Sequence, residues 1–192
     1  MSTQTAGKRF SKISIGIIGA GRIGSDVINK LAALSPKKIL VNDIDKSRLT
    51  FSDKRISKAS KEQILKKADL VSLHLPLTKK TKNMLSYEDL KLMKSDAFLI
   101  NTSRGGIIRE KDLIKVLKEG HLSAVAIDVF ENEPYVGGLI GIENCLLTSH
   151  MGSMTEDCRT KMEIEATEEI VRYFKNKKLK NLVPEEEYKN QY

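Results

Sequence analysis

The sequence has few of the residues that mark specialised classes of protein. Its 192 residues include only two cysteines, Cys145 and Cys158, which form no Cys-x-x-Cys pair and no Cys/His cluster. We therefore predict neither a disulfide framework nor a metal site. No apolar run approaches the roughly 18 residues that cross a bilayer, so no membrane partner is expected. Free thiols and the lack of a span favour a cytoplasmic protein.

What is present is the composition of an ordinary globular chain. Hydrophobic residues make up 40%, charged residues 30% and aromatic residues 5%. These values exclude collagen and low-complexity disorder. A chain of this length buries roughly 70% of its unfolded surface, which is enough for one sizeable core. The length predicts a single main domain.

The charge is positive and unevenly distributed. The net charge is +8, and residues 1–82 hold 18 basic and only 6 acidic side chains. A basic half can attract nucleic acid or a phosphorylated ligand. The basic residues are scattered and not interleaved with aromatic residues, so we expect no nucleic-acid partner.

The N-terminal pattern has two interpretations. Lys8, Arg9 and Lys12 precede the apolar run 13–18, and a basic segment before an apolar one is typical of a secretory signal. Here the run leads directly into a glycine motif that requires a strand before it. We interpret the run as a strand.

Short apolar runs alternate with amphipathic stretches along the chain, which predicts a parallel sheet with helices on both faces. Ser60 with Gln63 forms a capping-box pattern, Ser86 can cap a short helix, and Gly120 is suited to a helix end. The fold class expected is α/β, a Rossmann-type doubly wound sheet in one three-layer domain. The expected strands are 13–18, 38–42, 70–75, 97–101, 123–129 and 145–148, and the expected helices lie over 23–31, 60–67, 87–93, 109–119 and 155–175.

A G-x-G-x-x-G motif follows the first predicted strand. It reads Gly19-Ala20-Gly21-Arg22-Ile23-Gly24 and opens a predicted helix. Gly19 permits the tight turn, Gly21 lets the backbone approach a pyrophosphate, and Gly24 lets the helix pack on the strand. The N-terminus of that helix favours a phosphate. A nucleoside-triphosphate loop is excluded, because Arg22-Ile23 stands where Lys-Ser/Thr is needed.

An acidic residue stands at the expected distance from this motif. Asp43 ends the second predicted strand, 19 residues after Gly24. Its carboxylate can accept hydrogen bonds from the ribose hydroxyls and would repel a 2′-phosphate, which favours NAD over NADP. Asp45 supports this interpretation, whereas Lys46 and Arg48 weaken it slightly.

Four further polar patches follow predicted strands. In a doubly wound sheet, ligands bind outside the carboxyl ends of the strands, so the patches are expected beside the glycine turn. They are residues 74–78 (HLPLT), 101–106 (NTSRGG), 128–134 (DVFENEP) and 148–152 (TSHMG).

Together with the glycine motif, these patches resemble the D-isomer-specific 2-hydroxyacid dehydrogenases, which include D-3-phosphoglycerate dehydrogenase. The resemblance covers about residues 7–176 and preserves the order and spacing of five motifs. It implies an NAD-dependent oxidoreductase, or its cofactor-binding domain, which transfers hydride between NAD(H) and a small D-2-hydroxy or 2-oxo acid.

The resemblance also implies roles for individual residues. Arg104 matches the arginine that binds the substrate carboxylate and carbonyl, and a guanidinium suits a planar 2-oxo acid. His150 matches the acid/base, for which imidazole is suited near neutral pH. Glu133 matches its carboxylate partner, and is preferred to Glu131 because it directly precedes Pro134. The cofactor-binding positions implied are Gly19, Gly21, Arg22, Ile23, Gly24, Asp43, His74, Pro76, Thr102, Ser103, Asp128 and Gly152.

Members of the family place a substrate-binding segment before the glycine motif, whereas only 18 residues precede Gly19 here. We expect a leader at 1–11, the NAD-binding domain at 12–178, and a tail at 179–192 that resembles a stub of the substrate domain. Closure of a cleft normally completes such a site, so turnover without the other half is in question. The resemblance implies a homodimer through the NAD-binding domain.

A second function remains open beside the oxidoreductase. A free-standing NAD(H)-binding module, acting as a sensor or interaction partner, would keep the glycine motif and Asp43. It would have no use for Arg104 together with His150, and for this reason we rank it second.

Overall fold

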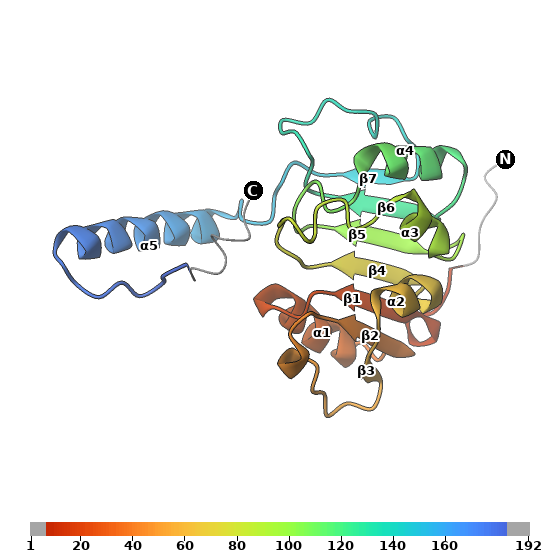
Figure 1. Ribbon diagram of the computed structural model, residues 1–192, viewed down its shortest axis with the longest axis horizontal. Coiled ribbons are helices and arrows are strands. Elements are labelled where there is room, and N and C mark those ends of the chain that lie inside the picture. The colour runs from red at the N-terminus through yellow and green to blue at the C-terminus, as the bar shows by residue number, and fades with distance from the viewer. Residues whose placement is uncertain (1–6, 184–192) are drawn as a thin grey trace.

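The computed structural model of the chain describes residues 7–183, and its centre is a seven-stranded parallel sheet (Figure 1). The strand order is β3-β2-β1-β4-β5-β6-β7. The chain therefore runs from β1 outward to β3, returns to the middle at β4 and continues to β7. The strands are β1 Ser14–Ile18, β2 Lys38–Asn42, β3 Ile56–Lys58, β4 Leu70–Leu73, β5 Phe98–Asn101, β6 Ala124–Ile127 and β7 Cys145–Leu147.

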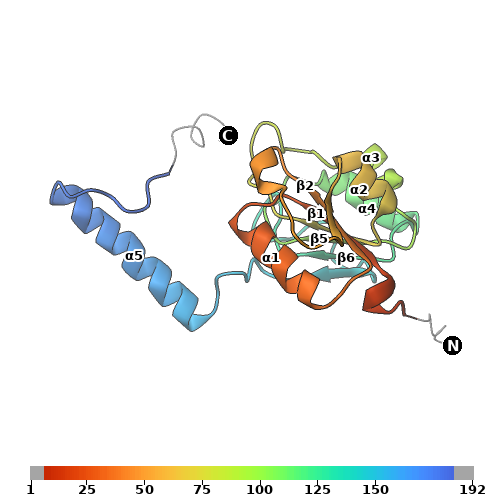
Figure 2. The same cartoon turned by 90° about the horizontal axis from the view of Figure 1, so that it is seen from below.

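Helices lie on both faces of this sheet (Figure 2). One face carries α1, and the other carries α2, α3 and α4. This arrangement confirms the predicted Rossmann-type α/β fold. The helices are α1 Arg22–Ala33, α2 Lys61–Lys67, α3 Tyr87–Leu92, α4 Glu110–Lys118 and α5 Glu156–Phe174, with short 3-10 helices η1 Phe10–Lys12 and η2 Lys46–Arg48.

The apolar character of β1 arises from burial on both faces. Ile15 and Ile17 are fully buried and pack with Ile28 of α1. Ile18 points to the opposite face, where it joins the cluster that contains Ile64 of α2. Because helices cover both faces of this strand, neither face favours polar side chains. The run 13–18 is therefore almost continuously apolar.

The capping residues predicted at three helix ends are confirmed. The Ser60 hydroxyl accepts from the N–H of Gln63, and the Gln63 side chain accepts from the N–H of Ser60. Ser86 caps α3 in the same way, with Asp89 as its reciprocal partner. Gly120 has φ +69° just after α4. Each device satisfies backbone groups that a helix end leaves without a partner.

The edge strand β3 was missed by the sequence analysis. It is three residues long and, within the part of the chain that the structure describes, pairs with β2 alone. A segment of that length contains too few residues to show an alternation of apolar and polar side chains. The strand β4 is also two residues shorter than predicted, because the chain leaves the sheet at His74.

The third layer of the domain is incomplete in the described part of the chain. In register with Ile15, Phe98 lies on the α1 face of the sheet, and its exposed fraction is 46%. Leu146 lies on the same face and is 65% exposed. Over residues 7–183, α1 is the one α-helix that packs on this face, where Ile28 contacts the apolar residues of β1 and β2.

The long C-terminal helix α5 is confirmed, but it extends away from the sheet (Figures 1 and 2). It contributes no buried residue. After it, the N–H groups of Lys180 and Asn181 donate to the Glu169 carboxylate. The predicted tail lies partly outside the described residues, as does most of the predicted leader. The proposed boundaries at 12 and 178 stay predictions.

Candidate active site

The glycine turn has the close approaches that the motif predicts. Gly19 has φ +100°, and a Cβ at this position would lie 2.2 Å from the carbonyl oxygen of His74. A Cβ at Gly24 would lie 1.9 Å from the carbonyl oxygen of Gly19. Neither position accepts a side chain, because backbone atoms occupy the space. The turn thus brings α1 against the ends of β1 and β4.

The middle glycine has open space in front of it. A Cβ at Gly21 would meet nothing closer than an Arg48 nitrogen at 3.7 Å. Gly21 is the N-cap of α1, and no side chain caps this helix, in contrast to α2 and α3. The first N–H groups of α1 therefore remain available to an anion. This fits the pyrophosphate of a dinucleotide, with Arg22 and Ile23 exposed beside it.

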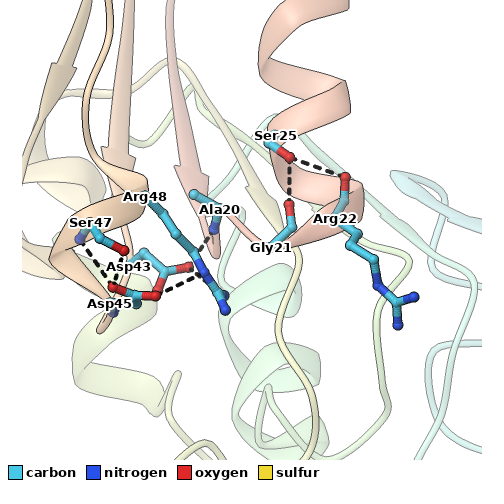
Figure 3. Close-up of polar contacts among 8 residues, drawn as sticks. All are labelled: Ala20, Gly21, Arg22, Ser25, Asp43, Asp45, Ser47 and Arg48. Atoms are coloured by element: carbon cyan, nitrogen blue, oxygen red, sulfur yellow. Dashed lines mark hydrogen bonds and ion pairs between the residues drawn. The ribbon is translucent and has the colours of Figure 1, made fainter. Parts of the chain in front are cut away.

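The side chain of Asp43, which follows β2, is hydrogen-bonded to the glycine turn (Figure 3). Its side chain is 5% exposed. One oxygen accepts from the N–H of Ala20 at 2.6 Å, and the other accepts from the N–H of Asp45 at 2.8 Å. A carboxylate has about four acceptor sites, so two remain for ribose hydroxyls.

The four polar patches meet at one edge of the sheet, as expected. All strands are parallel, and the patches follow the carboxyl ends of β4, β5, β6 and β7. The glycine turn and Asp43 follow β1 and β2 at the same edge. The order of the strands reverses between β1 and β4, which is where a doubly wound sheet binds its ligand.

Arg104, Glu133 and His150 line one hollow of about 490 Å³. They come from the loops after β5, β6 and β7 respectively. All three side chains are exposed. Lys82 lines the same hollow and was not predicted. Its only signal in the sequence is a positive charge, and many lysines carry that signal.

The imidazole of His150 is paired with Glu133. Its Nδ1 lies 2.9 Å from Glu133 Oε2, and the other Glu133 oxygen accepts from the N–H of Phe130 at 3.0 Å. The contact with His150, and then the Phe130 N–H, lower the pKa of the Glu133 carboxyl. With Nδ1 engaged, Nε2 is the ring nitrogen left for a substrate.

Asp128 fixes the backbone that carries this histidine. It is 6% exposed, and it accepts from the Thr148 hydroxyl at 2.5 Å and from the N–H of Met151 at 2.9 Å. The N–H of His150 donates to the Asp128 carbonyl at 2.8 Å. His150 itself has φ +53°, an uncommon conformation for a residue with a side chain. Such strain persists where surrounding contacts impose it, here the loop contacts of Asp128.

Two residues that the sequence analysis did not single out hold Arg104 in place. Asn101 is 2% exposed; its amide donates to the Arg104 carbonyl at 3.0 Å, and its oxygen accepts from the N–H and hydroxyl of Ser103. A Cβ at Gly105 would lie 1.8 Å from the carbonyl oxygen of Phe130, so two loops are in backbone contact there. Asparagine and glycine are common in loops, and neither residue type by itself indicates this role.

The remaining predicted positions lie at the same edge. His74 is half-buried; its Nε2 lies 3.0 Å from the Ser72 hydroxyl, and burial lowers its pKa. A protonated imidazole is therefore disfavoured at this position. The other three loop residues, Pro76, Thr102 and Gly152, are exposed. Their roles in cofactor binding stay predictions.

Another hollow, of about 700 Å³, lies at the opposite end of β1 and β2. It contains none of the predicted site residues. Within residues 7–183, no three potential metal-ligating side chains lie together. In the same range, no helix is long and apolar enough to cross a membrane.

The fold and this edge of the sheet define a dinucleotide-binding domain. A sequence model described as the NAD binding domain of D-isomer specific 2-hydroxyacid dehydrogenases matches residues 1–152. The chain belongs to this family, and NAD is its cofactor.

Two curated relatives illustrate the similarity. Glyoxylate reductase of Thermococcus litoralis is 37% identical over 173 residues, which are 88% of this chain and 51% of that enzyme. D-3-phosphoglycerate dehydrogenase of Methanocaldococcus jannaschii is 34% identical over 199 aligned residues, which cover 92% of this chain and 35% of the relative. The chain thus spans about half, or less, of the length of these relatives.

Solved structures agree with this assignment. D-lactate dehydrogenase of Aquifex aeolicus, complexed with NAD and lactic acid, matches with a TM-score of 0.80 and 26% identity, over 92% of this chain and 57% of that one. An acyclic imino acid reductase in complex with NADPH and D-Arg matches with a TM-score of 0.76 and 31% identity, over 92% of this chain and 55% of that one.

Proposed function

We propose that this chain carries the catalytic half of an NAD-dependent oxidoreductase that interconverts a small D-2-hydroxy acid and the corresponding 2-oxo acid. The observation that carries the proposal is the joint placement of Arg104, Glu133 and His150 around one hollow. A domain that only binds NAD(H) has no need of an arginine and an acid/base pair at this place.

The glycine turn would hold the cofactor, with its pyrophosphate at the N-terminus of α1 and its ribose hydroxyls on Asp43. When bound as NADH, the cofactor supplies a hydride for the carbon of the 2-oxo group. The fit rests on the uncapped N-terminus of α1 and on the open space at Gly21.

The residues of this chain would supply binding and proton transfer. The guanidinium of Arg104 presents a fork of donors that matches the carboxylate of a 2-oxo acid. Protonated His150 donates its Nε2 proton to the carbonyl oxygen as that oxygen becomes a hydroxyl group. Glu133 holds the ring through Nδ1 and offsets the charge of its protonated form.

The test is oxidation of NADH by the purified chain with hydroxypyruvate, glyoxylate, pyruvate or 2-oxoglutarate. We expect turnover with at least one acid. Arg104→Ala should abolish turnover and keep NADH binding, which is measured by fluorescence titration. Arg159→Ala is the control, because Arg159 lies on α5 and pairs with Glu163.

The alternative, an NAD(H)-binding module without turnover, predicts a different result. The folded chain would then bind NADH but oxidise none with any acid, and Arg104→Ala would change nothing. That outcome would overturn the proposal for this chain.

We further propose that the chain acts in the cytoplasm and forms a homodimer through this domain. The location rests on the two free cysteines, and the homodimer rests on the family resemblance. Sedimentation equilibrium of the purified chain tests the dimer, and a monomer at all concentrations would contradict it.

A further inference from the structure

A cation lies beside the carboxylate that is expected to bind the adenosine ribose. Arg48 ends η2, and its Nη1 lies 3.9 Å from Asp43 Oδ2. The same nitrogen would lie 3.7 Å from a Cβ at Gly21. The guanidinium is therefore at the mouth of the glycine turn, between Asp43 and Gly21 (Figure 3).

A second carboxylate restrains this arginine. The Nε of Arg48 lies 3.1 Å from Asp45 Oδ2. The other oxygen of Asp45 accepts from the hydroxyl of Ser47 at 2.6 Å and from its N–H at 3.0 Å. These bonds fix the orientation of Asp45 and lower its pKa, so that the carboxylate is ionised at neutral pH. Arg48 is thereby held toward the two acids.

The balance of charge in this group disfavours a phosphate. Asp43, Asp45 and Arg48 together carry one net negative charge. A 2′-phosphate on the ribose would add about −1.5 to −2 at neutral pH and would be repelled. The ribose hydroxyls of NAD are neutral donors that Asp43 can accept at no such cost.

The fold by itself does not make this choice. The similar acyclic imino acid reductase was solved with NADPH, so the architecture accommodates a 2′-phosphate. Discrimination must then come from side chains after β2. Arg48 is the side chain of this group that could attract a 2′-phosphate, and it is half exposed.

We propose that Asp45 determines cofactor specificity by acting through Arg48. By holding the guanidinium toward Asp43, Asp45 prevents it from pairing with a 2′-phosphate and so favours NAD(H) over NADP(H). Asp45 is a positioning residue in this account. The inference rests on the cofactor-binding part of the proposed function and needs no turnover.

The test compares NADH and NADPH binding by fluorescence titration of wild type and Asp45→Asn. Asparagine keeps an oxygen for Ser47 but removes the charge, which leaves Asp43 and Arg48 neutral as a pair. We expect NADPH affinity to rise about tenfold relative to NADH affinity, the effect of about one charge-assisted hydrogen bond. The gain should shrink at high salt, because the groups are partly exposed.

Two further variants test whether the gain depends on Arg48 and on the position of Asp45. The double variant Asp45→Asn/Arg48→Gln should lose the gain, because the cation that binds the phosphate is gone. Asp53→Asn is the matched control: Asp53 pairs with Arg55 at 2.6 Å, two residues along the chain, at the opposite end of the sheet. It should leave the ratio of the two affinities unchanged.

Each remaining outcome counts against the inference. A merely structural role for Asp45 would weaken both dinucleotides together and keep their ratio. A gain that survives in the double variant would exclude Arg48 as the phosphate ligand. Failure of the wild-type chain to bind either dinucleotide would overturn the cofactor-binding role as well, and this is distinguishable from an unchanged ratio.

Discussion

His150 and Glu133 stand on different loops, 17 residues apart, and meet at 2.9 Å between Nδ1 and Oε2. The pair is held from both sides: the N–H of Phe130 donates to Glu133, and the Asp128 carbonyl accepts from the N–H of His150. The ring is thus oriented before any substrate binds. Such preorganisation is what an acid/base group requires.

The first prediction concerns this pair. Glu133→Gln removes the charge that stabilises the protonated imidazole of His150. With a 2-oxo acid that the wild-type chain reduces, kcat should therefore fall about a hundredfold. NADH affinity should stay within a factor of about two, measured by fluorescence titration. Glu131→Gln is the matched control, because that carboxylate accepts from the N–H of Glu110 rather than from a histidine. Equal losses in the two variants would contradict the assignment.

The second prediction concerns the contact between two loops at Gly105. An alanine Cβ there would lie 1.8 Å from the Phe130 carbonyl oxygen, and backbone atoms cannot rotate away as a side chain can. Gly105→Ala should lower stability by about 1–3 kcal/mol and displace the neighbouring Arg104. Turnover should fall more than NADH affinity does. Gly7→Ala, which meets nothing within 4 Å, is the control. A melting temperature equal to wild type would refute the clash.

The third prediction concerns pH and Asp69. Burial raises the pKa of this carboxyl, but the N–H of Ser14 at 2.7 Å and the ammonium groups of Lys94 and Lys8 outweigh it, and the pKa is lowered overall. A lowered folded-state pKa means that Asp69 stabilises the fold above its unfolded pKa of about 4. This contribution is lost as the pH falls through the folded value.

Asp69→Asn should therefore lower stability by about 1–2 kcal/mol at pH 7, and by progressively less below pH 4. Urea unfolding at several pH values measures this difference. Asp26→Asn, which removes an exposed pair with Lys30, should have little effect at any pH. A loss for Asp69→Asn that does not vary with pH would show that its charge is not responsible.

The fourth prediction concerns the two thiols. Burial raises the pKa of Cys145 to about 11, so at pH 8 only about one molecule in a thousand carries the thiolate there. Labelling of the folded protein with a chromogenic disulfide at pH 8 should therefore be dominated by Cys158. Cys158→Ser should remove the fast phase, and Cys145→Ser should leave it. Equal labelling rates for the two thiols would count against the burial of Cys145.

Much of the fold could be predicted because apolar runs and capping residues depend on burial and hydrogen bonding within a few neighbouring residues. The run 13–18 is apolar because both of its faces are covered, and Ser60 with Gln63 satisfies a helix end within four residues. The short edge strand β3 could not be predicted, because three residues carry no periodic signal. The direction of α5, which extends away from the sheet, could not be predicted from the residues of that helix either.

The candidate site divides in the same way. The glycine motif, Asp43 and the four patches were identifiable from type and spacing, because parallel strands bring their carboxyl ends to one edge. The supporting roles of two residues in the patch 101–106 were not identifiable. The side chain of Asn101 bonds to Ser103 and Arg104 within its own loop, and Gly105 lies against the distant backbone of Phe130. Arg48 shows the limit most clearly, since in the sequence it only weakens the case for NAD.

The sequence by itself determined most of the segments that form strands and helices, the glycine turn after β1, and the residue types that follow each strand. These depend on burial, capping and steric freedom within a few neighbouring residues. Tertiary structure decided that Asp43 accepts from Ala20, that the Arg48 guanidinium lies beside Gly21, and that Glu133 reaches His150. Such contacts depend on how loops that follow different strands are placed relative to one another, which the residues of one loop do not specify.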